Sequence, residues 1–326
     1  MSEQHTKKDM PFLQVQDLVV EYVSDGETVH AVNGVSITLE KGRTLGLVGE
    51  TGAGKTTIAK SILRILPDVG SKIAGGKIYL DGQDVLALPE KEMRKIRGNV
   101  ASMIFQDPMT ALNPVQRVGE QIAEVVRLHS DDHNSTHHVQ RAKEMLEIVG
   151  IPAERYYEYP HQFSGGMKQR VVIAIALACN PDLLLADEPT TALDVTIQAQ
   201  VMDLIGDLQK KYNTAMLLIT HDMGVVATVC NDVAVIYAGN IVEHGSKEQI
   251  FDHPTHPYTI GLFGAIPDMN EDEEWLHPIH GLPPTPPTCP RAAPSAPGAN
   301  TPPRRAVKVP SKCRRRRTAT CAAAAV

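Results

Sequence analysis

The octapeptide Gly49-Glu50-Thr51-Gly52-Ala53-Gly54-Lys55-Thr56 fits the phosphate-loop pattern G-x-x-x-x-G-K-[ST] at every fixed position. The apolar run at 45–48 before it predicts a buried strand. The helical spacing at 58–66 after it predicts a helix that Pro67 ends. A phosphate loop needs this order of strand, loop and helix, so the stretch indicates an α/β fold that binds a nucleoside triphosphate.

Each part of this loop has a physical task. Glycines let the backbone turn tightly, so that successive N–H groups face inward and bind anionic oxygens, and the helix start adds its positive dipole end. We expect Lys55 to reach the outer phosphates and the Thr56 hydroxyl to hold magnesium. The alternative is a glycine-rich turn that happens to precede a lysine. The flanking strand and helix patterns argue against it.

Composition is typical of a soluble globular protein. The 326 residues suffice for one large domain and an appendage, and the 42% hydrophobic and 21% charged residues are ordinary. The longest apolar run, at 171–179, has nine residues, whereas a membrane-spanning helix needs about 20. Residues 1–10 are polar and contain no apolar signal core, which predicts a cytoplasmic location.

Charge is unevenly distributed along the chain. The net charge is −6, yet nine Lys or Arg and no acidic residue occur from Arg291 onward, so residues 1–290 are distinctly acidic. An acidic body argues against general nucleic-acid binding, which depends on positive patches. Cys179 and Cys230 lie in apolar contexts and are predicted to be buried thiols of a reducing compartment.

The apolar segments predict alternating strands and helices. Strands are expected at 15–23, 35–39, 77–80, 100–105, 183–186, 215–220 and 233–237, with turns at 24–26 and 81–82. The later strands fit a buried parallel sheet with helices between them. A helical block between Val118 and Val172 interrupts this order and predicts an inserted helical subdomain at about 107–178.

The C-terminal region differs in composition from the rest. Eleven of the 23 prolines lie at 278–310, and an arginine run with an alanine-rich end follows. Such a segment cannot carry a regular hydrogen-bonded ladder and lacks apolar periodicity. Residues 283–326 are therefore predicted to be largely disordered.

The apolar run at 183–186 ends in two acids, Asp187 and Glu188. A carboxylate at the end of a strand is well placed to bind magnesium beside a phosphate loop, and the next one to polarise an attacking water. The alternative is a strand that ends at a solvated acidic turn. That alternative loses weight because the same chain carries a phosphate loop.

A second glycine-containing turn precedes the apolar helix expected at 171–179. It reads Phe163-Ser164-Gly165-Gly166-Met167-Lys168-Gln169-Arg170. A serine hydroxyl, free N–H groups and a helix dipole end together make a second anion site. An ordinary serine N-cap is the alternative. The position of Ser164, 23 residues before Asp187, favours the anion site.

These motifs together resemble those of the nucleotide-binding subunits of ABC transporters. Six motifs occur in order: Gly49 to Thr56, Gln106 at 104–108, the signature Ser164-Gly165-Gly166, the pair Asp187-Glu188, Asp194 at 191–194 and His221 at 219–222. The resemblance extends from about Phe12 to about Pro267. An N-terminal antiparallel β subdomain, an α/β P-loop core, an inserted helical subdomain and a C-terminal extension are the fold that it implies.

The chain most resembles the oligopeptide and dipeptide importer branch of this family. The stretches that carry this resemblance are 106–114, 163–167, 190–196 and His256-Pro257-Tyr258-Thr259. Phe163 and Met167 replace the leucine and glutamine usual in the wider superfamily. Methionine cannot donate the hydrogen bonds of a glutamine amide. The implied domains are the ABC domain at 11–255, a branch-specific extension at 256–282 and the tail at 283–326.

The resemblance also assigns roles to single residues in the hydrolysis of ATP with Mg²⁺. Glu188 is the expected general base, His221 orients the γ-phosphate, and Gln106 senses the γ-phosphate or its magnesium. The expected ATP contacts are Tyr22, Gly49, Glu50, Thr51, Gly52, Ala53, Gly54, Lys55, Thr56, Thr57, Gln106 and His221. The expected magnesium ligands are Thr56, Gln106 and Asp187. Four signature residues, Ser164, Gly165, Gly166 and Met167, would bind the ATP of a partner subunit, and Asp194 would lie in the dimer loop.

Tyr22 is the expected stacking partner of adenine, because its planar ring meets a planar base at low entropic cost. A half-buried strand tyrosine is the alternative interpretation.

The resemblance implies partners and a location as well. The partners are a second ABC ATPase subunit, expected to be a paralogue, two transmembrane permease subunits and an extracytoplasmic substrate-binding protein, without nucleic acid. The protein would then be peripheral, at the cytoplasmic face of a bacterial or archaeal cell membrane. Peptides are the favoured cargo. Nickel or another small solute, and a nucleic-acid-linked ABC ATPase, are the alternatives. Glu188 and His221 argue against a module that binds ATP without hydrolysing it.

Two further groups of residues match no metal pattern. Four histidines within ten residues lack a common zinc spacing and are expected to lie in a polar loop: His129, His133, His137 and His138. Three tail cysteines lack the spacing of an iron–sulfur site, which usually needs four thiolates: Cys289, Cys313 and Cys321.

Overall fold

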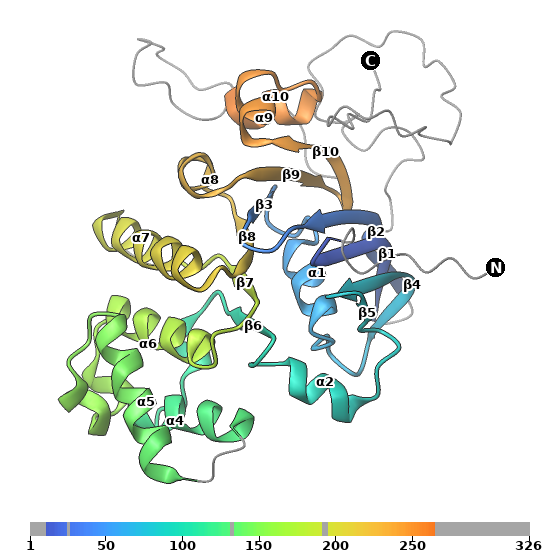
Figure 1. The fold of residues 1–326 in the computed structure, drawn as a ribbon. Coiled ribbons are helices and arrows are strands. Elements are labelled where there is room, and N and C mark those ends of the chain that lie inside the picture. The colour runs from blue at the N-terminus through green and yellow to red at the C-terminus, as the bar shows by residue number, and fades with distance from the viewer. Residues whose placement is uncertain (1–10, 25–26, 131–133, 191–194, 265–326) are drawn as a thin grey trace, which may run out of the picture. The chain divides into compact units, whose positions relative to one another are not determined.

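The computed structural model describes residues 11–24, 27–130, 134–190 and 195–264 (Figure 1). The chain divides into two compact units, each assembled from stretches that are distant in sequence. The first unit comprises Met1–Gln14, Thr38–Thr44 and Tyr79–Thr220, and the second comprises Val15–Ile37, Leu45–Ile78 and His221–Val326.

An antiparallel sheet contains the strands nearest the N-terminus, in the order β2-β1-β4-β5. These strands are β1 (Leu13–Ser24), β2 (Glu27–Leu39), β4 (Ser71–Leu80) and β5 (Gln83–Asp84). Core-facing and solvent-facing residues alternate along β2, as a sheet with one buried face requires. The strand predicted at 77–80 and the turn predicted at 81–82 are confirmed, since Leu80 of β4 pairs across the turn with Gln83 of β5.

The second unit places the phosphate loop between a buried strand and a helix, as predicted. Strand β3 (Thr44–Val48) is buried throughout and pairs in parallel with β9 (Asp232–Tyr237). Strand β10 (Asn240–Ser246) adds to β9 in antiparallel orientation, which the sequence did not predict. Three short helices also belong to this unit: α8 (Met223–Val229), α9 (Lys247–Asp252) and α10 (Pro257–Gly264).

Helix α1 (Lys55–Ile62) begins earlier and ends earlier than the predicted 58–66. It begins at Lys55 because Gly54, in a left-handed conformation, occupies the N-cap position. It ends before Pro67 is reached, because Arg64 adopts a left-handed conformation with φ of 52° and breaks the helical path.

The first unit contains the parallel strands that the apolar runs predicted. Strand β7 (Leu183–Asp187) pairs in parallel with β6 (Ala101–Ile104) on one side and with β8 (Ala215–Thr220) on the other. All three strands are buried along their whole length, which explains their continuous apolar sequences. Helix α7 (Val195–Tyr212) follows β7 and returns the chain to β8.

A group of helices occupies the predicted helical block (green in Figure 1). Its members are α3 (Pro108–Ala111), α4 (Val118–His129), α5 (Ser135–Ile148), the 3₁₀ turns η1 (Ala153–Tyr157) and η2 (Pro160–Gln162), and α6 (Gly165–Leu177). Helix α4 packs against α5, and both contact α6. Ile122, Met145 and Leu146 are fully buried in this group, as the helical spacing predicted. The first unit also contains α2 (Glu90–Ile96), which the sequence did not predict.

The polar loop predicted around the histidines is partly wrong. Helix α5 already begins at Ser135, because the Asn134 side chain accepts a hydrogen bond from Thr136 N and caps the helix. His137 and His138 therefore lie in the first turn of α5, and His138 is buried. His133 lies outside the described residues.

Cysteine burial agrees with the sequence for one residue and differs for the other. Cys230 is a buried free thiol whose pKa burial raises to about 12. Cys179 is also a free thiol but is only half-buried, and burial raises its pKa as well. The cysteines of the tail lie outside the described residues.

Among the described helices, none combines the length and the apolar character needed to cross a bilayer.

Candidate functional site

The phosphate loop needs glycine at two of its positions because of close backbone approaches. A Cβ on Gly49 would lie 2.2 Å from the carbonyl oxygen of Ile236, and one on Gly54 would lie 2.4 Å from that of Ala31. Both glycines also have positive φ, 155° and 102° respectively. Any other residue at either position would displace the loop from the strands that support it.

Lys55 lies inside this loop as the motif requires. Its Nζ donates hydrogen bonds to the carbonyl oxygens of Gly49 at 2.7 Å and Glu50 at 2.8 Å. The side chain is buried, so these bonds compensate an ammonium group that has lost water. The loop carbonyls thereby hold a positive charge at the point where the outer phosphates of a nucleotide would bind.

Tyr22 lies close to the first turn of helix α1, which follows the phosphate loop. Its hydroxyl lies 3.4 Å from Thr57 Oγ1, within hydrogen-bonding distance. The stacking of Tyr22 on adenine stays a prediction. His221 is exposed and immediately precedes Asp222, whose side chain caps helix α8 by accepting from Gly224 N and Val225 N.

Two acids end strand β7, as predicted. Asp187 is buried and pairs with Ile219 in the parallel register of β7 and β8. Glu188 follows with φ of 45°, a left-handed conformation rare for a side chain of this kind, and its N–H donates to the Ile219 carbonyl at 2.8 Å. A strained backbone held by a neighbouring strand is typical of residues at functional sites.

Gln106 and Glu188 meet although they are far apart in sequence. The Gln106 Nε2 donates to Glu188 Oε2 at 2.8 Å, from the segment that follows β6. This bond fixes the orientation of a carboxylate that is itself largely buried. The structure thus brings together the predicted general base and one of its predicted catalytic neighbours.

The signature turn opens helix α6 and faces solvent. The Ser164 hydroxyl accepts a hydrogen bond from Met167 N at 3.4 Å and caps the helix, so the N-cap alternative is realised. Ser164 and Gly165 are exposed, and a Cβ on Gly165 would meet open space. A capped helix start with exposed residues remains accessible to a ligand of another molecule.

Arg155 contacts both unusual residues of the signature, and the sequence did not single it out. Its guanidinium lies 4.4 Å from the Phe163 ring centroid, and its Nη1 lies 3.3 Å from Met167 Sδ. Glu158 and the Gln162 carbonyl accept further hydrogen bonds from the same guanidinium. A planar cation over an aromatic ring is favourable, which explains why phenylalanine and methionine fit here. The sequence carries no local pattern that marks such an arginine.

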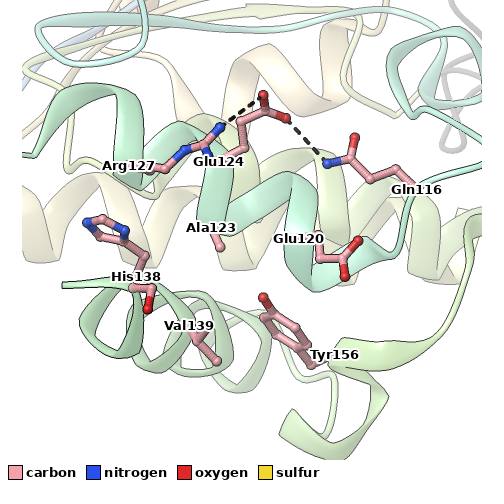
Figure 2. Close-up of a pocket in the computed structure, with 9 residues that line it drawn as sticks. Gln116, Glu120, Ala123, Glu124, Arg127, His138, Val139 and Tyr156 are labelled. Atoms are coloured by element: carbon pink, nitrogen blue, oxygen red, sulfur yellow. Dashed lines mark hydrogen bonds and ion pairs between the residues drawn. The ribbon is translucent and has the colours of Figure 1, made fainter. Parts of the chain in front are cut away.

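A separate cavity of about 310 Å³ lies among the helices of the first unit, between α4, α5 and η1 (Figure 2). Glu124 lies beside it and interacts with Gln116 Nε2 at 3.4 Å and with Arg127 Nη2 at 3.7 Å. Tyr156 also lines it, and burial together with the charge of Glu120 raises the pKa of that tyrosine. None of the predicted ATP or magnesium residues lines this cavity.

The structure brings the predicted residues together in three local groups. The first holds Tyr22 with the phosphate loop, the second pairs Gln106 with Glu188, and the third is the Ser164 turn. Asp194 lies outside the described residues. Within the described ranges, no three His, Cys, Asp or Glu side chains cluster so as to hold a metal ion. The predicted magnesium ligands are instead a hydroxyl, an amide and a carboxylate, the kind of oxygen donors of which Mg²⁺ takes only a few from protein.

Comparison with known proteins gives two matches to family models. Residues 32–191 match the family described as "ABC transporter", and residues 242–297 match the "Oligopeptide/dipeptide transporter, C-terminal region". The chain is 50% identical to the oligopeptide transport ATP-binding protein OppD of Bacillus subtilis over 275 residues, covering 83% of this chain and 76% of that protein. The chain belongs to the ABC transporter family. Within it, this ABC protein is also 50% identical to the dipeptide transport ATP-binding protein DppD of Bacillus subtilis, with 83% and 82% of the two chains covered.

Solved structures agree with this family assignment. One similar structure is a dimeric ATP-binding cassette in a post-hydrolysis state bound to ADP and Pi. It is 25% identical to this ABC protein with a TM-score of 0.65, and 72% of this chain and 98% of that one are covered. A bacterial ABC transporter cassette, also solved as a dimer, matches at 26% identity with the same TM-score and coverage. The predicted resemblance and the predicted ABC ATPase fold are thereby confirmed.

Proposed function

We propose that this chain is the ATP-hydrolysing subunit of an ABC importer for dipeptides or oligopeptides. The observation that carries hydrolysis is the 2.8 Å hydrogen bond from Gln106 to Glu188, which orients a carboxylate at the end of β7. The match of residues 242–297 to the C-terminal region of oligopeptide and dipeptide transporters supports peptides as the cargo. The names of the relatives at 50% identity support the same cargo.

ATP would bind along the phosphate loop. Backbone N–H groups of 49–57 surround the phosphates, and Lys55 neutralises the outer ones from within the loop. Tyr22 stacks on adenine next to Thr57, and His221 orients the γ-phosphate. The hydrogen bonds of Lys55 to the loop and the 3.4 Å approach of Tyr22 to Thr57 support the parts given to Lys55 and Tyr22.

Magnesium would take oxygen ligands from three residues of the chain. These are the Thr56 hydroxyl, the Asp187 carboxylate and the Gln106 side-chain carbonyl, all hard donors that Mg²⁺ prefers. When bound, the ion neutralises charge on the β- and γ-phosphate oxygens. The family resemblance assigns Thr56 and Asp187 to one ion, and the burial of Asp187 at a strand end supports its part.

Glu188 would act as the general base of hydrolysis. Its carboxylate accepts the proton of the attacking water, while Gln106 holds Oε2 in place. A base works only within hydrogen-bonding reach of the proton that it removes, so a fixed carboxylate is an advantage. The left-handed backbone of Glu188 keeps the group at the end of β7 instead of continuing along the strand.

A second subunit would complete the site. Ser164, Gly165, Gly166 and Met167 would bind the ATP held by the partner, and Asp194 would lie in the loop between the two subunits. The exposure of Ser164 and Gly165 supports this, as does the dimeric state of the similar cassettes. A paralogue is the proposed partner, as the importer branch resemblance implies.

The proposed assembly includes two transmembrane permease subunits and an extracytoplasmic substrate-binding protein. The chain would then be a peripheral protein at the cytoplasmic face of a bacterial or archaeal membrane, without a nucleic-acid partner. We further propose an ABC domain at 11–255 with a helical subdomain at about 107–178, an extension at 256–282 and a disordered tail at 283–326.

Purification of a Glu188→Gln variant from native membranes in the presence of ATP tests this function. The variant should retain ATP and co-purify two permease subunits, a second ATPase and a peptide-type binding protein. Cells that lack the gene should lose uptake of a labelled dipeptide or oligopeptide and regain it with the wild-type chain. Recovery of ribosomes or nucleic acid, or unimpaired peptide uptake, would contradict the proposal.

A further inference from the structure

We infer that Tyr258 is a positioning residue for the phosphate loop, through which the segment after β10 sets how tightly the chain binds ATP. The inference rests on the proposed function, since it assigns the loop at 49–56 to ATP. It adds a residue outside the six motifs to the nucleotide machinery and gives the segment around Tyr258 a task within this chain.

The contact that carries the inference joins residues far apart in the chain. The backbone N–H of Glu50 donates a hydrogen bond to the Tyr258 hydroxyl at 3.2 Å. The carbonyl of the same residue accepts a bond from Lys55 Nζ at 2.8 Å. Glu50 is thus held on both sides, by Tyr258 on one and by the phosphate-binding lysine on the other. A shift of the Tyr258 hydroxyl would move the carbonyl that positions Lys55.

The Tyr258 ring is itself fixed. It is buried, and its centroid lies 4.4 Å from that of Tyr237, the last residue of β9. Burial first, and the charge of Glu50 second, raise the pKa of Tyr258, so its hydroxyl stays neutral at physiological pH. A neutral hydroxyl keeps lone pairs that accept from Glu50 N–H.

A buried carboxylate anchors the helix that carries this tyrosine. Glu243 accepts from Thr255 N at 2.8 Å, from Thr255 Oγ1 at 2.7 Å and from His256 N at 3.1 Å. Burial alone would raise the pKa of Glu243, but hydrogen bonds, among them those from Thr255 and His256, outweigh it and lower the pKa. The carboxylate is therefore ionised and holds the start of α10.

The backbone around Glu243 shows how it reaches this position. The pairing of β10 with β9 shifts register between Ile241 and Glu243, which marks a β-bulge. A bulge re-aims the side chain that follows it. At the start of α10, Tyr258 N donates to the side chain of the preceding His256, at Nδ1, over 3.2 Å. A continuous series of hydrogen bonds thus leads from Glu243 through His256 to Tyr258, whose hydroxyl accepts from the N–H of Glu50.

A second contact from the same region supports the loop at Ala53. Gly239, in the turn between β9 and β10, donates from its N–H to the Ala53 carbonyl at 3.1 Å. The phosphate loop is therefore braced by the turn before β10 and by the helix after it. The contact from Gly239 to Ala53 uses only backbone atoms. The Tyr258 hydroxyl is therefore the side-chain group that a substitution can remove.

The test uses the full-length Tyr258→Phe variant, which keeps the ring and removes the hydroxyl. We expect the Kd for MgATP to rise on the order of 2- to 10-fold, the loss that one neutral hydrogen bond explains. Without nucleotide, the Glu50 amide should exchange its hydrogen faster than in wild type. Tyr237→Phe is the matched control, because it removes a hydroxyl from the facing ring and should leave Kd and Glu50 exchange near wild type.

The exchange measurement separates this inference from the proposed function. Failure of the wild type to bind MgATP would contradict the proposed function. Hydrogen exchange of the Glu50 amide, measured without nucleotide, would still test whether Tyr258 holds the loop. Equal Kd values and equal Glu50 exchange in Tyr258→Phe and wild type would overturn the inference. If Tyr258→Phe does not fold, hydrogen exchange in the wild type tests the inference instead. The Glu50 amide should then exchange more slowly than the amide of exposed Thr51. Equal rates at the two amides would overturn the inference.

Discussion

Gln106 and Glu188 are joined by a hydrogen bond of 2.8 Å between Nε2 and Oε2, across 82 residues of sequence. Strands β6 and β7 are parallel neighbours, so the segments that follow them emerge at the same edge of the sheet. An amide and a carboxylate that approach from adjacent strand ends act as a unit. The first two predictions concern this pair.

Glu188→Gln should lower the ATPase rate by about 100-fold or more and leave the Kd for MgATP close to wild type. The amide has nearly the shape of the carboxylate but cannot accept a proton at neutral pH. Steady-state phosphate release and equilibrium nucleotide binding measure the two effects. A variant that turns over normally would exclude Glu188 as the general base.

Gln106→Ala should also reduce turnover, by less than Glu188→Gln, because the base remains but is no longer held. In the double variant the two losses should be less than additive, since the two side chains share one hydrogen bond. A double-mutant cycle on kcat gives the coupling. Fully additive losses would mean that the two side chains contribute independently.

Gly54→Ala should weaken MgATP binding by roughly 100-fold, and Gly52→Ala by about tenfold. Both glycines have positive φ, so alanine is strained at each. Only Gly54 also faces a backbone atom, the Ala31 carbonyl 2.4 Å from the added Cβ, whereas nothing lies within 4 Å at Gly52. Titration with a fluorescent ATP analogue compares them, and equal losses would show that φ strain alone matters.

Arg155→Lys should lower the free energy of unfolding by about 1 kcal/mol, because lysine cannot keep both the Glu158 bonds and the stacking on Phe163. Urea unfolding followed by circular dichroism measures this. Arg127→Lys is the matched control: its pair with Glu124 is longer, at 3.7 Å, and more exposed, so little change is expected. Equal effects of the two substitutions would contradict the role given to Arg155.

Acid should destabilise the region around α10 through His256. Burial lowers the pKa of His256 more than the charge of Glu243 raises it. The unfolded chain therefore takes up a proton more readily than the folded chain. The stability contributed by neutral His256 is present above pH 6.5, the ordinary histidine value, and declines as the pH falls below it.

His256→Asn tests this pH dependence. Asparagine does not titrate and keeps an oxygen that can accept from Tyr258 N in place of Nδ1. Unfolding free energies between pH 8 and pH 5 should therefore decline less steeply in the variant than in the wild type. An identical slope would show that other groups carry the acid sensitivity.

Continuous apolar runs were reliable predictors of the buried strands. The predicted strand at 215–220 coincides with β8, and those at 183–186 and 233–237 differ from β7 and β9 by one residue. Short amphipathic elements such as α2 and β10 were missed because they carry no long apolar run. The start of α5 was misjudged because its first turn is polar and depends on the cap at Asn134.

The candidate site likewise contains some features that the sequence predicts and others that only the folded structure shows. The phosphate loop, the two acids after β7 and the serine before α6 are local patterns, so the sequence contained them in readable form. The role of Arg155 was not predictable, because its guanidinium contacts the Phe163 ring and the Met167 sulfur only once the chain has folded. The support of Glu50 by Tyr258 was hidden for the same reason.

The sequence by itself determined the family, the phosphate loop and the reactive side chains, because each depends on residue types at short, regular spacing. Tertiary structure alone decided which of these groups touch. Parallel strand pairing joined Gln106 to Glu188, and the helix after a β-bulge brought Tyr258 to Glu50, 208 residues away. A hydrogen bond needs atoms about 3 Å apart, and spacing along a chain says nothing about such distances until the chain has folded.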